Sequence, residues 1–228
     1  MKSLIELILR LRWLQNMTKI SNKDLSKIKE RYSSRFEEYG LDIQKTLKPG
    51  SIEHYKRQHE IHLSGVDLED KAILDVGCGL ATYKDFLDKK NIKYKSYTGI
   101  DIVSDFIKTN KKQHPNSNFF CGTLDEYIEM SRNSYDVITF CQVFNNNFEE
   151  TDNMELVQSQ LSSAFKISNE MVSCDFIGNY VNYNDDFLYY YSPESIFAFC
   201  KSLTPYVLIN SSYSPYHYTV FLYKSITK

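Results

Sequence analysis

The sequence predicts an α/β fold in which helices cover both faces of a mostly parallel sheet, and two observations support this prediction. From about residue 70 onward, short runs of apolar and β-branched residues alternate with segments of helical periodicity. Such alternation is typical of parallel strands joined by crossover helices. The chain has 228 residues, of which 42% are hydrophobic and 25% are charged. This length and composition fit one folded domain with a short extension, and they exclude a disordered or low-complexity chain.

The net charge and the cysteines indicate which partners and which kinds of site are not expected. The formal net charge is −2, which makes nucleic acid an unfavoured partner. The five cysteines are Cys78, Cys121, Cys141, Cys174 and Cys200. Their number is odd and none forms a CxxC pair, so neither a disulfide framework nor a metal site is expected. Free cysteines of this kind favour a reducing, cytoplasmic location.

Residues 1–20 read as an amphipathic N-terminal arm. Leucines at positions 4, 7, 11 and 14 recur at helical spacing. Charged residues interrupt the apolar run, which is too short to cross a membrane and is followed by no signal-peptide cleavage site. Three interpretations remain open at this point. The arm docks on its own domain, or it pairs with a membrane surface or a second subunit in a homodimer, or translation starts at Met17.

Residues 21–66 are predicted to form a helical cap ahead of the sheet. A surface helix is expected over residues 21–38, with its N-cap at residue 21 or 22. Its sparse apolar residues are Leu25, Ile28, Tyr32 and Phe36. A turn follows at Lys48-Pro49-Gly50, and Ser51 is expected to cap a second helix that runs to about residue 63.

Residues 67–228 are predicted to form the sheet domain. The expected strands cover residues 72–76, 97–101, 118–121, 135–140, 171–176, 205–211 and 217–224. The expected helices cover residues 83–90, 103–113 and 152–168, and a further helix opens at Pro193. The last two strands are close enough in sequence to pair antiparallel. In sheets of this class, ligands bind beyond the C-terminal ends of the strands.

The most informative segment joins the first predicted strand to a helix. Gly77 permits a sharp turn there, and Gly79 lets a ligand approach the backbone closely. Asp101 ends the next strand, where a carboxylate can accept hydrogen bonds from both hydroxyls of a ribose. Thr82 stands where a dinucleotide site usually has a third glycine, and Asp75 would repel a pyrophosphate. A ligand with an ammonium or sulfonium group fits better, and S-adenosylmethionine carries both.

The segment Asp75-Val76-Gly77-Cys78-Gly79 resembles motif I of the class I S-adenosylmethionine-dependent methyltransferases. The resemblance extends over about residues 50–228, and residues 97–101 and 119–124 resemble the family's ribose-binding strand and adenine loop. The tail, residues 189–221, resembles a little-characterised bacterial small-molecule branch. What the resemblance implies is a Rossmann-like, seven-stranded, mostly parallel sheet whose last strand is antiparallel.

The resemblance also implies a set of cofactor-binding residues. In that reading, Asp75 lies near the amino-acid end of S-adenosylmethionine, and Asp101 holds its ribose. The family often has Asp where this chain has Thr123, so either Asp125 meets the adenine amino group, or Thr123 and backbone groups do. The predicted cofactor-binding residues are Asp75, Gly77, Cys78, Gly79, Thr82, Asp101, Ile102, Gly122, Thr123, Leu124 and Gln142. S-adenosylhomocysteine would be the product.

The implied reaction is methyl transfer by in-line displacement to an N or O atom of a small molecule. Such a transfer needs alignment above all, and a catalytic base is not obligatory, so no catalytic residue is assigned. Side chains that could orient the acceptor or remove a proton are Gln58, His59, His62, Gln142, Asn145 and Asn146. For His62, a surface position on a helix is the alternative interpretation.

The tyrosine-rich segment 179–191 has two interpretations, an aromatic and acidic cover over the acceptor, or plain packing. Two further function classes also stay open. One is an RNA or protein methyltransferase, which the net charge and the missing basic domain disfavour. The other is a non-catalytic module that binds a partner through its N-terminal helices, which the intact glycines of motif I disfavour.

Overall fold

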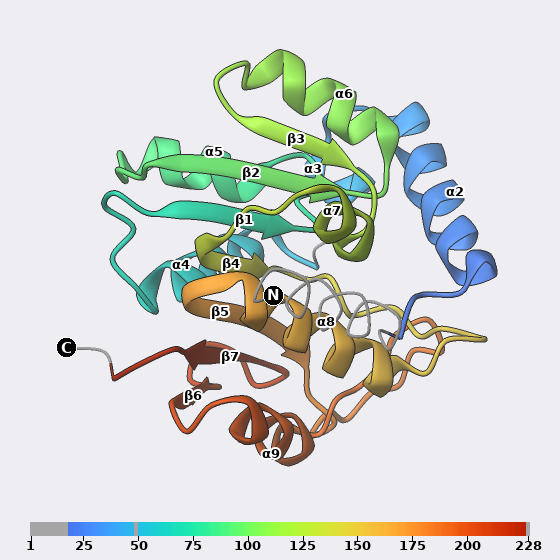
Figure 1. Cartoon of the computed structure of the whole chain (residues 1–228). Coiled ribbons are helices and arrows are strands. Elements are labelled where there is room, and N and C mark those ends of the chain that lie inside the picture. The colour runs from blue at the N-terminus through green and yellow to red at the C-terminus, as the bar shows by residue number, and fades with distance from the viewer. Residues whose placement is uncertain (1–17, 48–49, 227–228) are drawn as a thin grey trace, which may run out of the picture.

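The computed structural model describes residues 18–47 and 50–226, so most of the predicted amphipathic arm lies outside the described residues (Figure 1). A seven-stranded sheet in the order β3-β2-β1-β4-β5-β7-β6 forms the centre. Its strands are β1 Ala72–Val76, β2 Ser96–Asp101, β3 Asn118–Cys121, β4 Tyr135–Phe140, β5 Ser168–Ile177, β6 Val207–Asn210 and β7 His217–Tyr223. Strands β1 to β5 pair in parallel, whereas β7 pairs antiparallel with both β5 and β6. The predicted α/β fold with an antiparallel last strand is confirmed.

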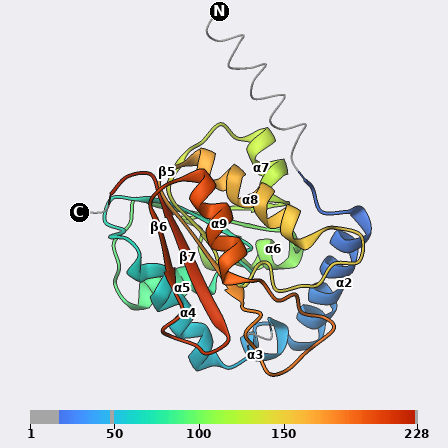
Figure 2. The ribbon, with the colours of Figure 1, turned by 90° about the horizontal axis from the view of Figure 1, so that it is seen from below.

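Helices cover both faces of this sheet, as Figures 1 and 2 show. The helices on one face are α4 (Ile52–Ser64), α5 (Thr82–Lys89) and α6 (Ser104–Gln113), and those on the other are α7 (Leu124–Met130), α8 (Asn153–Ile167) and α9 (Pro193–Leu203). Successive residues of a strand point to opposite faces. Accordingly, Ile73 packs into the core beneath α4 and α5, and Leu74 packs into the core beneath α7, α8 and α9. None of the described helices has the length and apolar character needed to cross a membrane.

Helix α2 (Asn22–Tyr39) lies across the C-terminal ends of the strands (Figure 1). The side chain of Ser21 caps it by accepting a hydrogen bond from the backbone N–H of Asp24. Its apolar face packs inward, where the rings of Tyr32 and Phe36 meet the ring of Phe106 on α6 edge-on, with centroids 6.3 and 5.5 Å apart. The helix therefore covers the sheet edge at which ligands of this fold class bind.

Asp24 fastens α2 to the loop that precedes α8. Its buried carboxylate accepts hydrogen bonds from the backbone N–H groups of Glu149, Glu150 and Thr151, at 3.0, 3.1 and 2.8 Å, and from the Thr151 hydroxyl at 2.8 Å. Burial alone would raise the pKa of Asp24, but the hydrogen bonds from the loop outweigh it and hold that pKa well below its usual range. The charged form of Asp24 is thus part of the fold.

Two short helices were not predicted. Helix α3 (Ile43–Thr46) has four residues and α7 has seven, and both are too short to show a clear apolar period. A local signal for α7 exists, because Thr123 and Glu126 form a capping box in which each side chain accepts a hydrogen bond from the other residue's backbone N–H. Residues 124–130 are therefore a helix that faces the cavity described below.

Candidate active site

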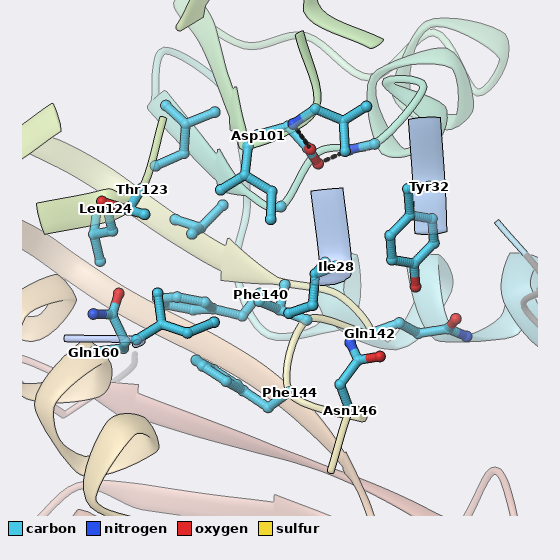
Figure 3. Close-up of a pocket in the computed structure, with 18 of the residues that line it drawn as sticks. Ile28, Tyr32, Asp101, Thr123, Leu124, Phe140, Gln142, Phe144, Asn146 and Gln160 are labelled. Carbon is cyan, nitrogen blue, oxygen red and sulfur yellow. Dashed lines mark hydrogen bonds between the residues drawn. The ribbon is translucent and has the colours of Figure 1, made fainter. Parts of the chain in front are cut away.

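A cavity lies at the C-terminal ends of β1, β2 and β4, beneath α2 (Figure 3). Most of the residues predicted to bind the cofactor meet there. Those that line the cavity are Gly77, Gly79, Asp101, Ile102, Gly122, Thr123, Leu124 and Gln142. Apolar side chains close the cavity from the side of α2, and Figure 3 shows Ile28 and Tyr32 reaching into it from that helix.

The loop after β1 needs its glycines for two reasons. Gly77 and Gly79 have φ angles of +71° and +52°, a region that side chains other than glycine disfavour. In addition, a Cβ atom at Gly77 would lie 2.7 Å from Cγ2 of Val143. The backbone N–H groups of Gly77 and Cys78 both donate to the carbonyl of Ile100 in β2, at 2.8 and 3.0 Å. The loop is thus a fixed backbone cradle with bare glycines toward the cavity.

Asp101 ends β2 and faces this cradle. Its carboxylate accepts hydrogen bonds from the backbone N–H groups of Gly79 and Val103, both at 2.9 Å (Figure 3). Burial raises the pKa of Asp101, and these N–H groups oppose the rise. A carboxylate has about four lone-pair positions, so two remain for further donors. A pre-oriented acceptor of this kind suits a pair of vicinal hydroxyls.

The other end of the cavity holds a second buried carboxylate. Both oxygens of Asp125 lie near Nε2 of Gln160 on α8, at 3.0 and 3.1 Å, and both residues line the cavity. The hydroxyl and backbone N–H of Thr123 are instead engaged with Glu126 in the helix cap. Of the two alternatives for the adenine amino group, this arrangement favours Asp125.

Three of the predicted residues do not line the cavity. Asp75 points to the opposite face of the sheet, because alternation along β1 turns Val76 toward the cavity. Its carboxylate accepts hydrogen bonds from the hydroxyls of Tyr97 and Thr139. Cys78 is buried, and its Sγ lies 3.8 Å from Nδ2 of Asn110. Thr82 contacts the cavity only indirectly, through a 2.6 Å hydrogen bond to the Tyr55 hydroxyl.

The position of Asp75 predicts a pH-dependent cost to folding. Burial raises the pKa of Asp75 to about 6, although the hydrogen bonds of Tyr97 and Thr139 oppose the rise. The unfolded chain loses this proton near pH 4, so the contribution of Asp75 to stability falls as the pH rises from about 4 to about 6. We expect Asp75→Asn to raise the free energy of unfolding by roughly 2 kcal/mol at pH 7 and by little at pH 4. Urea unfolding at the two pH values measures this, and a variant less stable than wild type at pH 7 would contradict it.

Polar side chains continue the cavity beyond the cofactor residues. Gln142 and Asn146 line it together with Phe144 (Figure 3). Gln142 adopts a φ of +58°, and its backbone N–H donates to Oδ1 of Asp175 at 2.7 Å. The Asn146 side-chain oxygen accepts a hydrogen bond from Arg31 of α2 at 2.9 Å. The side-chain amide of Gln142 donates to Oε1 of Gln58, so neighbouring residues hold both side-chain amides in place.

The other candidate side chains lie behind the wall of the cavity. Gln58, His59 and His62 are buried on α4, with exposed fractions of 0%, 3% and 1%. A surface position for His62 is thus wrong, because α4 packs this polar face against polar residues of the sheet such as Asp175. Asn145 does not line the cavity either.

The N-terminal helices contribute residues that the sequence did not assign to the site. The cavity is lined from this part of the chain by Ile20, Leu25, Ile28, Tyr32, Leu47 and Tyr55. The helical spacing of the apolar residues in α2 was a visible signal, but it did not reveal what the apolar face covers. The tyrosine-rich segment 179–191 lines no part of the cavity. It pairs instead with the neighbouring loop, where the N–H of Tyr189 donates to the carbonyl of Asn145 at 3.1 Å.

Comparisons with known proteins agree with this geometry. Residues 73–163 match a family described as methyltransferase domain. A search of curated proteins finds no match to this sequence. Among solved structures, the chain is similar to magnesium protoporphyrin IX methyltransferase from Synechocystis PCC 6803 with bound S-adenosylmethionine, at 12% identity and a TM-score of 0.63. That match covers 91% of this chain and 100% of the other.

Two further solved structures have a similar fold. The plantazolicin methyltransferase, in complex with a substrate analogue and S-adenosylhomocysteine, is 14% identical with a TM-score of 0.57, and the match covers 87% of this chain and 90% of the other. A chain of the Pnkp1/Rnl/Hen1 RNA repair complex is 17% identical with a TM-score of 0.58, and the match covers 90% of this chain and 48% of the other. Likeness at this level of identity carries the fold, whereas the substrate has to be argued from the cavity.

Proposed function

We propose that this chain, a class I S-adenosylmethionine-dependent methyltransferase with its methyltransferase domain at residues 73–163, methylates a small neutral or cationic molecule on an N or O atom. The residues around the cavity fit the cofactor. The glycine cradle presents bare backbone to the cavity, Asp101 offers a fixed carboxylate for the ribose, and Asp125 offers one for the adenine amino group. When bound, the cofactor supplies an electrophilic methyl group on a sulfonium.

The charge of the cavity is the observation that carries the acceptor class. Among the described residues, those that line it include the carboxylates of Asp101 and Asp125 but neither Lys nor Arg. A phosphate-rich acceptor needs cations at its binding site, and RNA needs a basic surface. Because the cofactor would engage both carboxylates, the absence of Lys and Arg among the described residues of the cavity wall is what supports a neutral or cationic acceptor.

Helix α2 covers the cavity, and this favours a small molecule as the methyl acceptor. The helix contributes apolar side chains to the cavity and is fastened over it through Asp24. A long polymer would have to displace this helix, whereas a small molecule fits beneath it. Asn146 and Gln142 would orient the acceptor. Arg31 donates to the side-chain oxygen of Asn146, and the side-chain amide of Gln142 donates to Gln58 while its backbone N–H donates to Asp175. Alignment of acceptor and methyl group in this way is what an in-line displacement chiefly requires.

The acceptor class is tested by transfer of a radiolabelled methyl group from S-adenosylmethionine to three sets of acceptors. The sets are small amines and hydroxyl compounds, RNA, and protein extract. We expect stoichiometric labelling within the first set. Labelling of RNA or of protein, with none of small molecules, would overturn the proposed acceptor class while leaving the methyltransferase assignment intact.

Asn146 gives a sharper test once an acceptor is known. We expect Asn146→Ala to raise the KM for the acceptor about 10-fold, equivalent to about 1.4 kcal/mol, and to leave the affinity for S-adenosylhomocysteine unchanged. Asn147→Ala is the matched control, because Asn147 is exposed and its side chain donates to the carbonyl of Asp186 outside the cavity. An Asn146 variant with wild-type kinetics would remove this residue from the acceptor site.

A further inference from the structure

We propose that His62, Cys141 and Asp175 bind a divalent transition-metal ion of the zinc type. The three residues come from three separate elements, which are α4, the end of β4 and β5. The structure brings one potential ligand atom from each to within 4.8 Å of the others. The sequence predicted no metal site, because no short spacing links these residues. The inference does not depend on the identity of the methyl acceptor.

His62 is arranged as metal-binding histidines usually are. Its side chain is 1% exposed, and Nδ1 lies 2.7 Å from the Ser173 hydroxyl. Nε2 is buried and has no hydrogen-bond partner among the described residues, and it lies 3.7 Å from Oδ1 of Asp175. A hydrogen bond at one ring nitrogen fixes the ring and leaves the other nitrogen for the ion. An unpartnered polar atom at this depth otherwise costs free energy.

Asp175 and Cys141 complete the set of ligand atoms. The carboxylate of Asp175 is buried and held by the backbone N–H of Gln142 at 2.7 Å and by Nε2 of Gln58 at 2.5 Å. Each oxygen keeps a lone pair beyond these bonds. Cys141 is a free, half-buried cysteine, and its Sγ is the third of the grouped ligand atoms. A nitrogen, a sulfur and an oxygen that can each bind an ion therefore lie within 4.8 Å of one another.

The donor atoms select the class of ion. One imidazole nitrogen, one sulfur and one carboxylate oxygen suit Zn²⁺ or Co²⁺, whereas Mg²⁺ and Ca²⁺ prefer oxygen alone. One thiolate and one carboxylate also balance the two charges of the ion, so the loaded site is neutral in a buried position. Three protein ligands leave the fourth tetrahedral position open. Because Cys141 also lines the cavity, the ion would lie directly behind the cavity wall.

Binding must displace the proton of Cys141. A cysteine thiol is mostly protonated at neutral pH, and formation of the metal–sulfur bond releases one proton to solvent. No electron is transferred, so the step needs no further reactant.

The test uses the full-length chain freed of metal by dialysis against a chelator and titrated with Co²⁺ and then Zn²⁺. We expect one equivalent of Co²⁺ to bind with micromolar or tighter affinity, with a thiolate-to-metal charge-transfer band and release of about one proton per ion. Zn²⁺ should displace it and raise the Tm by about 5 °C or more at a 100-fold excess over Kd. Cys141→Ser should lose the band and at least about 100-fold in affinity, whereas Cys174→Ser, which removes a buried thiol from the neighbouring strand, should keep both.

Two results would overturn the proposal. One is a folded, metal-free wild type that gives no charge-transfer band with Co²⁺. The other is a band that persists unchanged in Cys141→Ser. If Cys141→Ser fails to fold, Asp175→Asn serves in its place, because the amide keeps an acceptor oxygen for Gln142 and loses the ligand charge. Wild-type affinity in a folded Asp175→Asn would then count against the site.

Discussion

Replacing Asp101 with alanine is expected to weaken binding of S-adenosylhomocysteine at least about 10-fold, a loss of about 1.4 kcal/mol or more. Two physical effects act in the same direction. The change removes the carboxylate that we propose binds the ribose, and it leaves the backbone N–H groups of Gly79 and Val103 without their acceptor. The glycine cradle then loses the contact that ties it to the end of β2. Calorimetric titration of S-adenosylhomocysteine into wild type and variant measures the loss.

Two further variants make the result specific. Asp101→Asn keeps an acceptor oxygen for one N–H group, so we expect a smaller loss than with alanine. Asp105→Asn is the matched control, because this carboxylate is 44% exposed and pairs with Lys108 at 3.0 Å on the same stretch of chain. The control should bind as wild type does. A folded Asp101→Ala protein with unchanged affinity would sink the assignment of Asp101 to the ribose.

The second large effect that we expect is a loss of folding stability when Asp24 is replaced. Asp24→Ala should lower the free energy of unfolding by about 4 kcal/mol at pH 7, because three backbone N–H groups and the Thr151 hydroxyl lose a charged acceptor at once. The pKa of Asp24 is lowered in the folded state. Its contribution is therefore fully present above about pH 4 and is lost as the pH falls below that value toward the folded-state pKa.

Urea unfolding at pH 7 and at pH 3 distinguishes this from a loss of general packing. The difference between wild type and Asp24→Ala should shrink at the lower pH. Glu37→Ala, an exposed change on the same helix, should leave stability within about 0.5 kcal/mol of wild type. A loss of equal size at both pH values would show that the charge of Asp24 does not hold the helix.

The strands of the sheet could be predicted from the sequence because the patterns that indicate them are local. The strand at residues 72–76 matches β1 in full, and the turn, cap and strand-end signals around Gly77, Ser51 and Asp101 lie within a few residues of what they specify. The predicted boundaries at residues 20, 21, 66 and 67 stay predictions, as does a homodimer. The likeness to one solved methyltransferase covers 91% of this chain.

What the sequence did not provide depends on contacts between distant segments. That α2 covers the cavity follows from Asp24 meeting residues 149–151, and no local pattern encodes that pairing. The direction of Asp75 depends on which face of the sheet α4 and α5 occupy. The burial of His62 likewise arises from a polar layer shared by α4 and β5, in which Nδ1 of His62 lies within hydrogen-bond distance of the Ser173 hydroxyl and Asp175 lies beside the ring. Helical periodicity alone would place a histidine of this kind at the surface.

The position of β7 has a consequence for how the chain is made. β7 pairs with β5 on one side and with β6 on the other, so β6 has no partner in the sheet until β7 arrives. During translation, β5 and β6 therefore leave the ribosome before the strand that joins them, and the edge of β5 stays open to other nascent chains. A stop codon that removes only the last dozen residues would delete β7 and would also leave β6 without its partner strand, so the sheet would lose two of its seven strands.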